Sequence, residues 1–233
     1  MSRRVTEILA AVSLLGMFLA VWMALQYVPT ALAADGEPNP VQRIFYVHVP
    51  SALTAFYAVG VLFVGSVGYL LTRRRGFDLA ALAATETSLL FCSIVLITGP
   101  IWAKPEWGRA WTWEPRLNLT AVLWLLLLGM VLVRRVSAHR DEGARFASVL
   151  GILALPVVYL VYTAVERWGG LHPKPTIGRD APSHDPRITL GFGICTLAFL
   201  LFGTLLIVLR ARLAALEERI GNLAAGAATG VAP

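Results

Sequence analysis

Six apolar runs, separated by short polar segments, follow one another along the chain. Each run approaches or reaches the roughly 20 residues that an α-helix needs to cross the hydrocarbon core of a bilayer. The runs lie near residues 8–28, 47–71, 79–100, 117–133, 146–165 and 188–209. This pattern predicts an all-α integral membrane protein, in which six transmembrane helices form a single domain over residues 1–233.

The first apolar run has to be distinguished from a cleavable signal. Two arginines precede it and small residues at 30–34 follow it, as in a secretory signal peptide. The run from Ile8 to Val28 is nevertheless longer than the roughly 7 to 15 apolar residues of such a signal. We therefore expect an uncleaved first helix whose outer end is marked by Pro29.

Composition agrees with this membrane assignment. Hydrophobic residues make up 57% of the chain and charged residues only 15%, whereas about a quarter of a soluble domain is charged. A net charge of +6 would favour nucleic acid in a soluble protein, but in a multi-pass protein the charges must first be assigned to the two sides of the membrane. The chain has no phosphate-binding Gly-rich motif, so any use of ATP would belong to a partner.

The distribution of cationic residues predicts the orientation of the helices. If the N-terminus is cytoplasmic, twelve of the 20 Lys and Arg residues lie in cytoplasmic segments and eight in outer loops. Cytoplasmic loops normally carry the excess, so we expect both termini in the cytoplasm. The outer cations are still numerous, which an anionic ligand would explain: Arg43, Lys104, Arg109, Arg116, Arg167, Lys174, Arg179 and Arg187.

The segment after the sixth run alternates charged and apolar residues. Its apolar residues recur at helical spacing: Leu213, Leu216, Ile220 and Leu223. We expect a cytoplasmic amphipathic extension over residues 210–233, which ends in a flexible Ala- and Gly-rich tail from Ala224.

The connection between the third and fourth helices concentrates aromatic and charged residues. Residues 102–116 read Trp-Ala-Lys-Pro-Glu-Trp-Gly-Arg-Ala-Trp-Thr-Trp-Glu-Pro-Arg and hold four of the seven tryptophans. We expect Pro105 to begin and Pro115 to end a short interfacial helix over 106–114. Each of two faces of that helix would combine aromatic with charged residues: Trp107, Trp111 and Glu114 on one, and Arg109, Trp113 and Arg116 on the other.

Aromatic rings beside guanidinium groups suit a planar ligand that carries carboxylates. The alternative is a generic aromatic belt, since tryptophan is common at both membrane interfaces. A belt should recur at the cytoplasmic boundary, where the chain has Tyr69, Phe77 and Phe146 but no tryptophan. The sequence therefore favours a ligand platform over an anchor.

Three of the four histidines fall on the outer side of the predicted helices. His48 stands at the outer mouth of the second helix, and His172 and His184 share the last outer loop. Neutral imidazole is a common metal ligand, although an interfacial histidine can also simply bond to the backbone.

The two cysteines, Cys92 and Cys195, lie inside apolar runs, where we expect them to be small core residues. Because the chain has no Cys-x-x-Cys-His motif, it cannot attach haem covalently.

One carboxylate lies within a predicted span. Glu86 falls on the order of 10 Å inside the start of the third helix, where an unpaired charge costs roughly 2 to 3 kcal/mol. Thr85, Thr87 and Ser88 surround it, which favours a network between helices over a proton relay.

Three segments, in this order, resemble the CcmC family of cytochrome c maturation, part of a wider haem-handling family with a tryptophan-rich external "WWD" loop. They read Tyr46-Val-His48-Val-Pro50, Trp107-Gly-Arg-Ala-Trp111-Thr-Trp113-Glu114-Pro115-Arg116-Leu117 and Trp168-Gly-Gly-Leu-His172. With the six helices, the resemblance covers nearly the whole chain. The chain departs from the family pattern at Ala110, where another tryptophan is usual, at Glu114, where aspartate is usual, and at Asn118, where threonine is common.

The resemblance implies a binding site for haem b, which would be held non-covalently and transiently. His48 and His172 would be the axial ligands of the iron, and because they come from different elements they could approach it from opposite faces. Indoles would cover the macrocycle, and arginines would pair with the propionates. The implied haem-contacting residues are Trp107, Gly108, Arg109, Trp111, Trp113, Glu114, Pro115, Arg116 and Trp168.

The resemblance also implies a location and partners. Family members hold haem at the periplasmic face of the bacterial inner membrane and deliver it to the haem chaperone CcmE, beside CcmA, CcmB and CcmD of an ABC-type transporter complex. The chain would then be a haem-binding protein and not an enzyme.

Two other functions remain open. A membrane b-type cytochrome for electron transfer usually needs histidines within helices, and none of the four is expected near the middle of the membrane. A permease subunit for a small molecule would need broken helices and polar pore residues, of which only Glu86 qualifies clearly.

Overall fold

The computed structural model describes residues 3–32, 37–173 and 185–229. His184, the alternative outer histidine, lies outside the described residues. The elements follow one another as α1 (Arg3–Trp22), a π-helical turn η1 (Met23–Tyr27), a 3₁₀ turn η2 (Pro40–Ile44), α2 (Phe45–Thr72), α3 (Arg75–Trp107), α4 (Pro115–Val136), α5 (Arg140–Trp168) and α6 (Pro186–Thr229). Within these described ranges, six helices are long and apolar enough to cross a membrane, which confirms the predicted all-α class.

Five of the six helices extend beyond both ends of the apolar runs that predicted them, and α6 does so by far the most. Its 44 residues correspond to about 66 Å at 1.5 Å per residue, roughly twice the thickness of a hydrocarbon core. The expected amphipathic extension is thus a direct continuation of α6. Residues 224–229, where we expected a flexible tail, continue the same helix, and their alanines favour that conformation.

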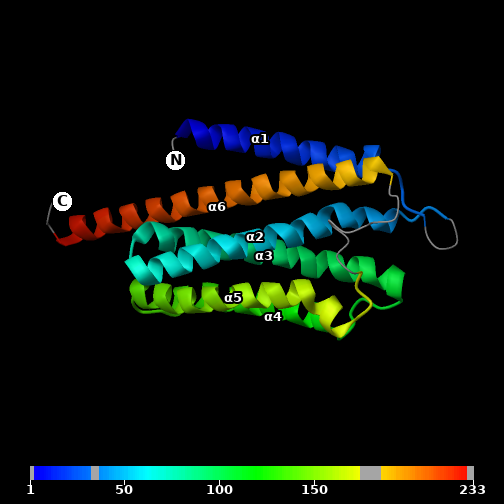
Figure 1. Ribbon diagram of the computed structural model, residues 1–233. Helices are drawn as coiled ribbons and strands as arrows, with labels where there is room; N and C mark the ends of the chain where they lie inside the picture. The colour runs from blue at the N-terminus through cyan, green and yellow to red at the C-terminus, as the bar shows by residue number, and fades with distance from the viewer. Residues whose placement is uncertain (1–2, 33–36, 174–184, 230–233) are drawn as a thin grey trace.

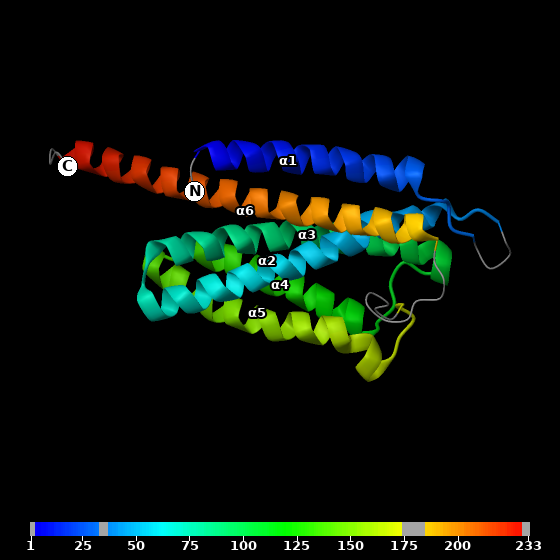
Figure 2. The same ribbon diagram turned by 45° about the horizontal axis from the view of Figure 1, so that its top comes forward.

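The helices lie side by side along a common direction (Figure 1). α2 packs against α3, α5 and α6, while α4 packs mainly against α5. α1 packs along α6 and stands apart from α4 and α5 in both views (Figure 2). The largest fully buried side chains include Phe91, Leu62, Leu123, Leu127 and Met130.

Small residues allow the helices to approach closely. A Cβ on Gly65 of α2 would lie 3.0 Å from the carbonyl oxygen of Phe77 on α3, and such small-residue contacts are typical between transmembrane helices. Cys92 and Cys195 are both free and buried, as expected of small core residues.

The bundle has two chemically different ends (Figure 1). The turns from α2 to α3 and from α4 to α5 lie at one end, which we call the arginine-rich end after Arg73, Arg74, Arg134 and Arg135. The connection from α3 to α4 lies at the opposite end, together with the start of α2 and the end of α5. We call this the tryptophan-rich end.

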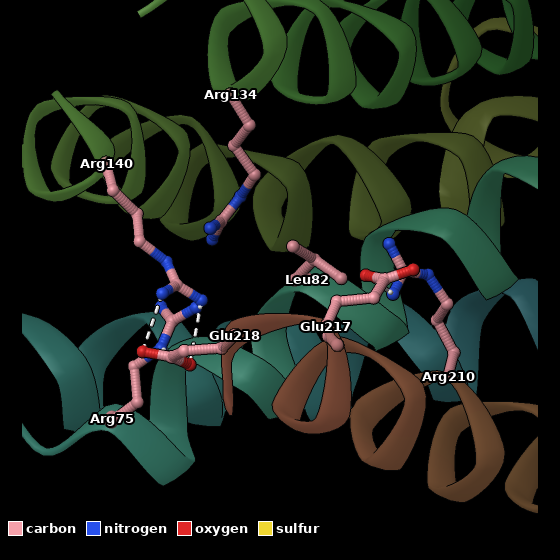
Figure 3. A pocket seen from close by; sticks show the side chains of 8 residues that line it. Arg75, Leu82, Arg134, Arg140, Arg210, Glu217 and Glu218 are labelled. Carbon is pink, nitrogen blue, oxygen red and sulfur yellow. Dashed lines mark hydrogen bonds and ion pairs between the residues drawn. The ribbon is translucent and has the colours of Figure 1, made fainter. Parts of the chain in front are cut away.

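Ion pairs tie the extension of α6 to its neighbours at the arginine-rich end. Oε2 of Glu218 accepts hydrogen bonds from Arg75 Nε at 2.9 Å and from Arg140 Nη2 at 2.8 Å. These residues line a cavity of about 310 Å³, into which Arg134 of α4 also points (Figure 3). Arg134 bonds at 2.7 Å to Asp78, which is fully buried. The cavity is therefore bordered by charges that already pair with one another.

Glu86 belongs to the same set of helix contacts. Its two carboxylate oxygens accept hydrogen bonds from Arg210 of α6, at 2.6 Å from Nε and 3.0 Å from Nη2. This bidentate pair joins α3 to α6 and confirms that Glu86 takes part in a network between helices.

Candidate functional site

The connection between α3 and α4 reverses the chain at Gly108. α3 passes through Pro105 and ends at Trp107. The next residue, Gly108, has a φ of 73°, in the left-handed region that glycine adopts without strain. The chain is then non-helical up to Pro115, the first residue of α4. The predicted short helix over 106–114 is therefore wrong. The long helix before Pro105 continues through it at the cost of one backbone hydrogen bond.

The tryptophans consequently do not share the helix faces that we predicted. The ring of Trp107 lies edge-to-face with Trp102, at a centroid distance of 5.1 Å, and with His172, at 6.3 Å. Trp111 and Trp113 lie 6.2 Å apart, and Trp113 is 85% exposed. The structure thus places Trp107 against His172, a candidate axial ligand of haem iron, and leaves the side chain of Trp113 exposed.

Two further predicted residues, Arg109 and Trp168, lie at the margin of the site, as does Ala110. Arg109 is exposed in the turn that follows Gly108, and so is Ala110, where the family usually has tryptophan. Trp168 is the last residue of α5 and is also exposed. The structure places none of these three side chains against His48 or His172.

His48 lies in the first turn of α2, at the tryptophan-rich end. Its Nδ1 is 2.8 Å from Oγ1 of Thr98 on the neighbouring helix α3. A Cβ on Gly99, the next residue of α3, would lie 3.4 Å from His48 Cε1. The imidazole therefore rests directly against the backbone of α3, on a rigid element.

His172 lies in the connection that follows α5. Its Nδ1 is 3.1 Å from the carbonyl oxygen of Pro173, and because a carbonyl only accepts, Nδ1 carries the proton and Nε2 the lone pair. Burial, together with the nearby guanidinium of Arg116, lowers the pKa of His172 to about 4. The ring is therefore neutral at pH 7, as a metal ligand must be.

Glu114 joins the tryptophan-rich connection to the segment that carries His172. Its Oε2 accepts hydrogen bonds from the backbone N–H groups of Leu171, at 2.7 Å, and His172, at 3.4 Å. A Cβ on Gly170, whose φ is +139°, would collide with the same oxygen, so the approach requires glycine. The structure therefore shows Glu114 bonded to the His172 segment, whereas the sequence had placed it on a face with Trp107.

Arg116 occupies the first turn of α4 and is within electrostatic reach of both His48 and His172. Among the described residues, four buried polar atoms between Gly108 and Arg116 have no hydrogen-bond partner: Trp111 Nε1, Thr112 Oγ1, Glu114 Oε1 and Arg116 Nη1. A buried guanidinium N–H without a partner is costly. A carboxylate of a bound ligand would satisfy it, so these residues fit an anionic, iron-containing ligand such as haem.

Two polar residues that contact this site could not be predicted from the sequence. Thr98 contacts His48 from 50 positions away. Gln42 accepts a hydrogen bond from the indole N–H of Trp102 at 3.2 Å, across 60 positions. Neither residue belongs to a recognisable motif, and contacts over such separations leave no local pattern.

Comparison with known proteins identifies the family to which this site belongs. A family model described as CcmC, heme exporter protein C, matches residues 1–225. The chain belongs to the CcmC family. It is 30% identical over 186 residues to a heme exporter protein C of Haemophilus influenzae, an alignment that covers 79% of this chain and 76% of that protein. It is 34% identical over 195 residues to that of Paracoccus denitrificans, covering 79% and 80%.

CcmC membership accounts for the main features of the chain. The chain is also 29% identical over 179 residues, or 77% of its length, to a heme exporter protein C of Escherichia coli. The chain is thus a multi-pass membrane protein that handles haem in cytochrome c maturation.

Proposed function

We propose that this CcmC-family protein binds haem b non-covalently at its tryptophan-rich end, with His48 and His172 as axial ligands of the iron. One observation supports the proposal: two histidines from separate elements are within electrostatic reach of one partly unsatisfied guanidinium, that of Arg116. Two neutral imidazoles are suited to ferric or ferrous haem iron, and the guanidinium is suited to a propionate.

The surrounding residues have distinct parts in this proposal. Trp107, which already stacks edge-to-face with His172, covers one part of the macrocycle. Trp111, whose indole N–H is buried without a partner among the described residues, covers another. Glu114, Gly108 and Pro115 act by shaping the connection, while the exposed Trp113, Trp168 and Arg109 form the rim. Haem is cargo here, so we assign no catalytic step.

The two ligands differ in how firmly they are held, which supports a function in transfer. His48 is part of a long helix, whereas His172 stands in a connection that Glu114 holds through hydrogen bonds. Breaking these bonds would open the His172 side of the haem while His48 stays in place. We therefore propose that haem leaves on the His172 side, toward the chaperone CcmE.

The proposed location follows from the charge distribution. The arginine-rich end carries the excess of cations that marks the cytoplasmic side, so the tryptophan-rich end faces the periplasm of a bacterial inner membrane. CcmA, CcmB and CcmD are the partners that we propose for this chain within a transporter complex.

The test is the haem content of the purified protein in detergent. His48→Ala and His172→Ala should each lose most of the haem while membrane insertion is unchanged, and His139→Ala, at the arginine-rich end, should retain it. If both outer variants kept the wild-type haem-to-protein ratio and absorption spectrum, the site would lie elsewhere.

A further inference from the structure

Thr98 bonds to two groups at once. Its Oγ1 lies 2.8 Å from Nδ1 of His48 and 2.7 Å from the carbonyl oxygen of Ile94, one turn earlier on α3. A threonine hydroxyl has only one hydrogen to donate. The direction of that hydrogen decides which ring nitrogen of His48 is protonated.

Two arrangements are conceivable, and they differ in energy. If the hydroxyl donates to Ile94, its oxygen accepts the Nδ1–H of His48 and every group is paired. If it donated to Nδ1 instead, two oxygens would face each other at 2.7 Å with no hydrogen between them. Two oxygens at that distance repel each other, whereas the first arrangement places the hydroxyl hydrogen between them. The first arrangement is therefore favoured, with the proton on Nδ1 and the lone pair on Nε2.

The remaining surroundings of the ring agree with this form. The Cε1 edge of His48 lies against Gly99, which keeps the imidazole oriented relative to α3. Nε2 of His48 accepts no hydrogen bond from any residue in the part of the chain that the structure describes. It is thus the nitrogen that remains for a ligand.

We propose that Thr98 is a positioning residue that holds His48 in its Nδ1-protonated form and so presents Nε2 to haem iron. This inference rests on the proposed function, because it concerns how His48 binds that iron. His172 reaches the same form through the carbonyl of Pro173. The tautomer of His48 is therefore set by a side chain on a helix, and that of His172 by a backbone carbonyl in a loop.

The first test compares haem affinity among three variants of α3. Thr98→Val keeps the shape of the side chain and removes the hydroxyl, and loss of such a partner typically lowers metal affinity about 10- to 100-fold. Thr98→Ser should restore the affinity to near the wild-type value. Thr85→Val is the matched control, because Thr85 bonds the carbonyl of Ala81 at 2.8 Å on the same helix without contacting a histidine.

The readouts are the dissociation constant for haem and the spin state of the bound iron. We expect Thr98→Val alone to bind weakly and to show a high-spin fraction. If wild type binds haem through His48 but Thr98→Val matches it in both readouts, the inference is overturned and the proposed function stands. If the wild-type protein binds no haem, the proposed function is wrong, and so is this role of Thr98.

A second measurement needs no haem. Nitrogen-15 NMR of histidine-labelled protein reports which ring nitrogen is protonated, and the His48 signals are identified by their loss in His48→Ala. We expect a protonated Nδ1 and an unprotonated Nε2 in wild type, with a shift toward protonated Nε2 in Thr98→Val. A protonated Nε2 in wild type would overturn the inference whatever the haem affinity.

Discussion

At the scale of single residues, the site combines groups with different physical tasks. His48 and His172 provide imidazole nitrogens, Arg116 provides a guanidinium that is not fully satisfied, and Glu114 holds backbone N–H groups. Only the two histidines and Arg116 would bond to haem itself, whereas Glu114 would act through the protein backbone. The expected effects of mutation differ accordingly.

Arg116→Lys should weaken haem binding although it conserves charge. A guanidinium can form two parallel hydrogen bonds to a propionate, which an ammonium cannot reproduce. We expect a loss of about 1 to 2 kcal/mol, or roughly 5- to 30-fold in affinity, measured by haem titration. Arg135→Lys, exposed at the arginine-rich end, is the control. Equal affinities for Lys and wild type, with loss only in Arg116→Gln, would show that charge alone matters.

The indoles should differ in importance. Trp107→Phe removes part of the surface that contacts His172, so haem retention should fall several-fold. Trp113→Phe should retain haem nearly as well as wild type, since that side chain is 85% exposed. Haem-to-protein ratios after gel filtration measure both. Equal retention in the two variants and wild type would instead favour a generic interfacial belt.

The candidate ligands could be predicted from residue type, but their partners could not. His48 and His172 stand beside aromatic residues at membrane boundaries, which is a visible pattern. Glu114 bonds to backbone N–H groups, and every residue type offers those, so nothing in the sequence marks its partner. Thr98 is one of several hydroxyl-bearing residues on α3, and only packing distinguishes it.

At the scale of elements, the connection from α3 to α4 departs most from the prediction. Pro105 was expected to begin a helix, yet α3 continues through it to Trp107 at the cost of one backbone hydrogen bond. The reversal at Gly108 then brings Glu114 next to the connection after α5. Two loops distant in sequence therefore meet at the candidate site.

Gly170→Ala should loosen that junction. The added Cβ would collide with Oε2 of Glu114, and φ of +139° is strained for alanine. We expect weaker haem binding, with a spectrum indicating partial loss of the His172 ligand. Gly129→Ala in α4, whose Cβ would meet no atom within 4 Å, should behave as wild type. An unaltered spectrum in Gly170→Ala would show that the Glu114 contact does not hold the ligand.

At the scale of the whole molecule, the number and positions of the helices followed from hydropathy alone. Their packing did not, because six apolar runs resemble one another and give no indication that α1 would pack along α6. The helical extension after the sixth apolar run could be predicted from its spacing, but not that it continues α6 without a break. Ion pairs with Arg75 and Arg140 show where that extension is attached.

Glu86→Gln tests whether this carboxylate stabilises the contact between α3 and α6 through its pair with Arg210. Glu86 and Arg210 are partly exposed, at 37% and 26% of their side-chain surfaces, so the pair should contribute no more than about 1 kcal/mol to the free energy of unfolding. We expect a small loss of stability in detergent and unchanged haem affinity. The exchange Glu86→Arg with Arg210→Glu should recover part of the stability. A large loss of haem transfer with intact stability would indicate a proton relay instead.

The central claim is that one haem is bound between His48 and His172, and electron paramagnetic resonance of the ferric, haem-loaded protein tests it most directly. We predict a low-spin signal typical of two imidazole ligands, which becomes high-spin in His172→Ala and recovers when free imidazole is added. A wild-type signal that is high-spin, or one that is unchanged in His172→Ala, would contradict the account.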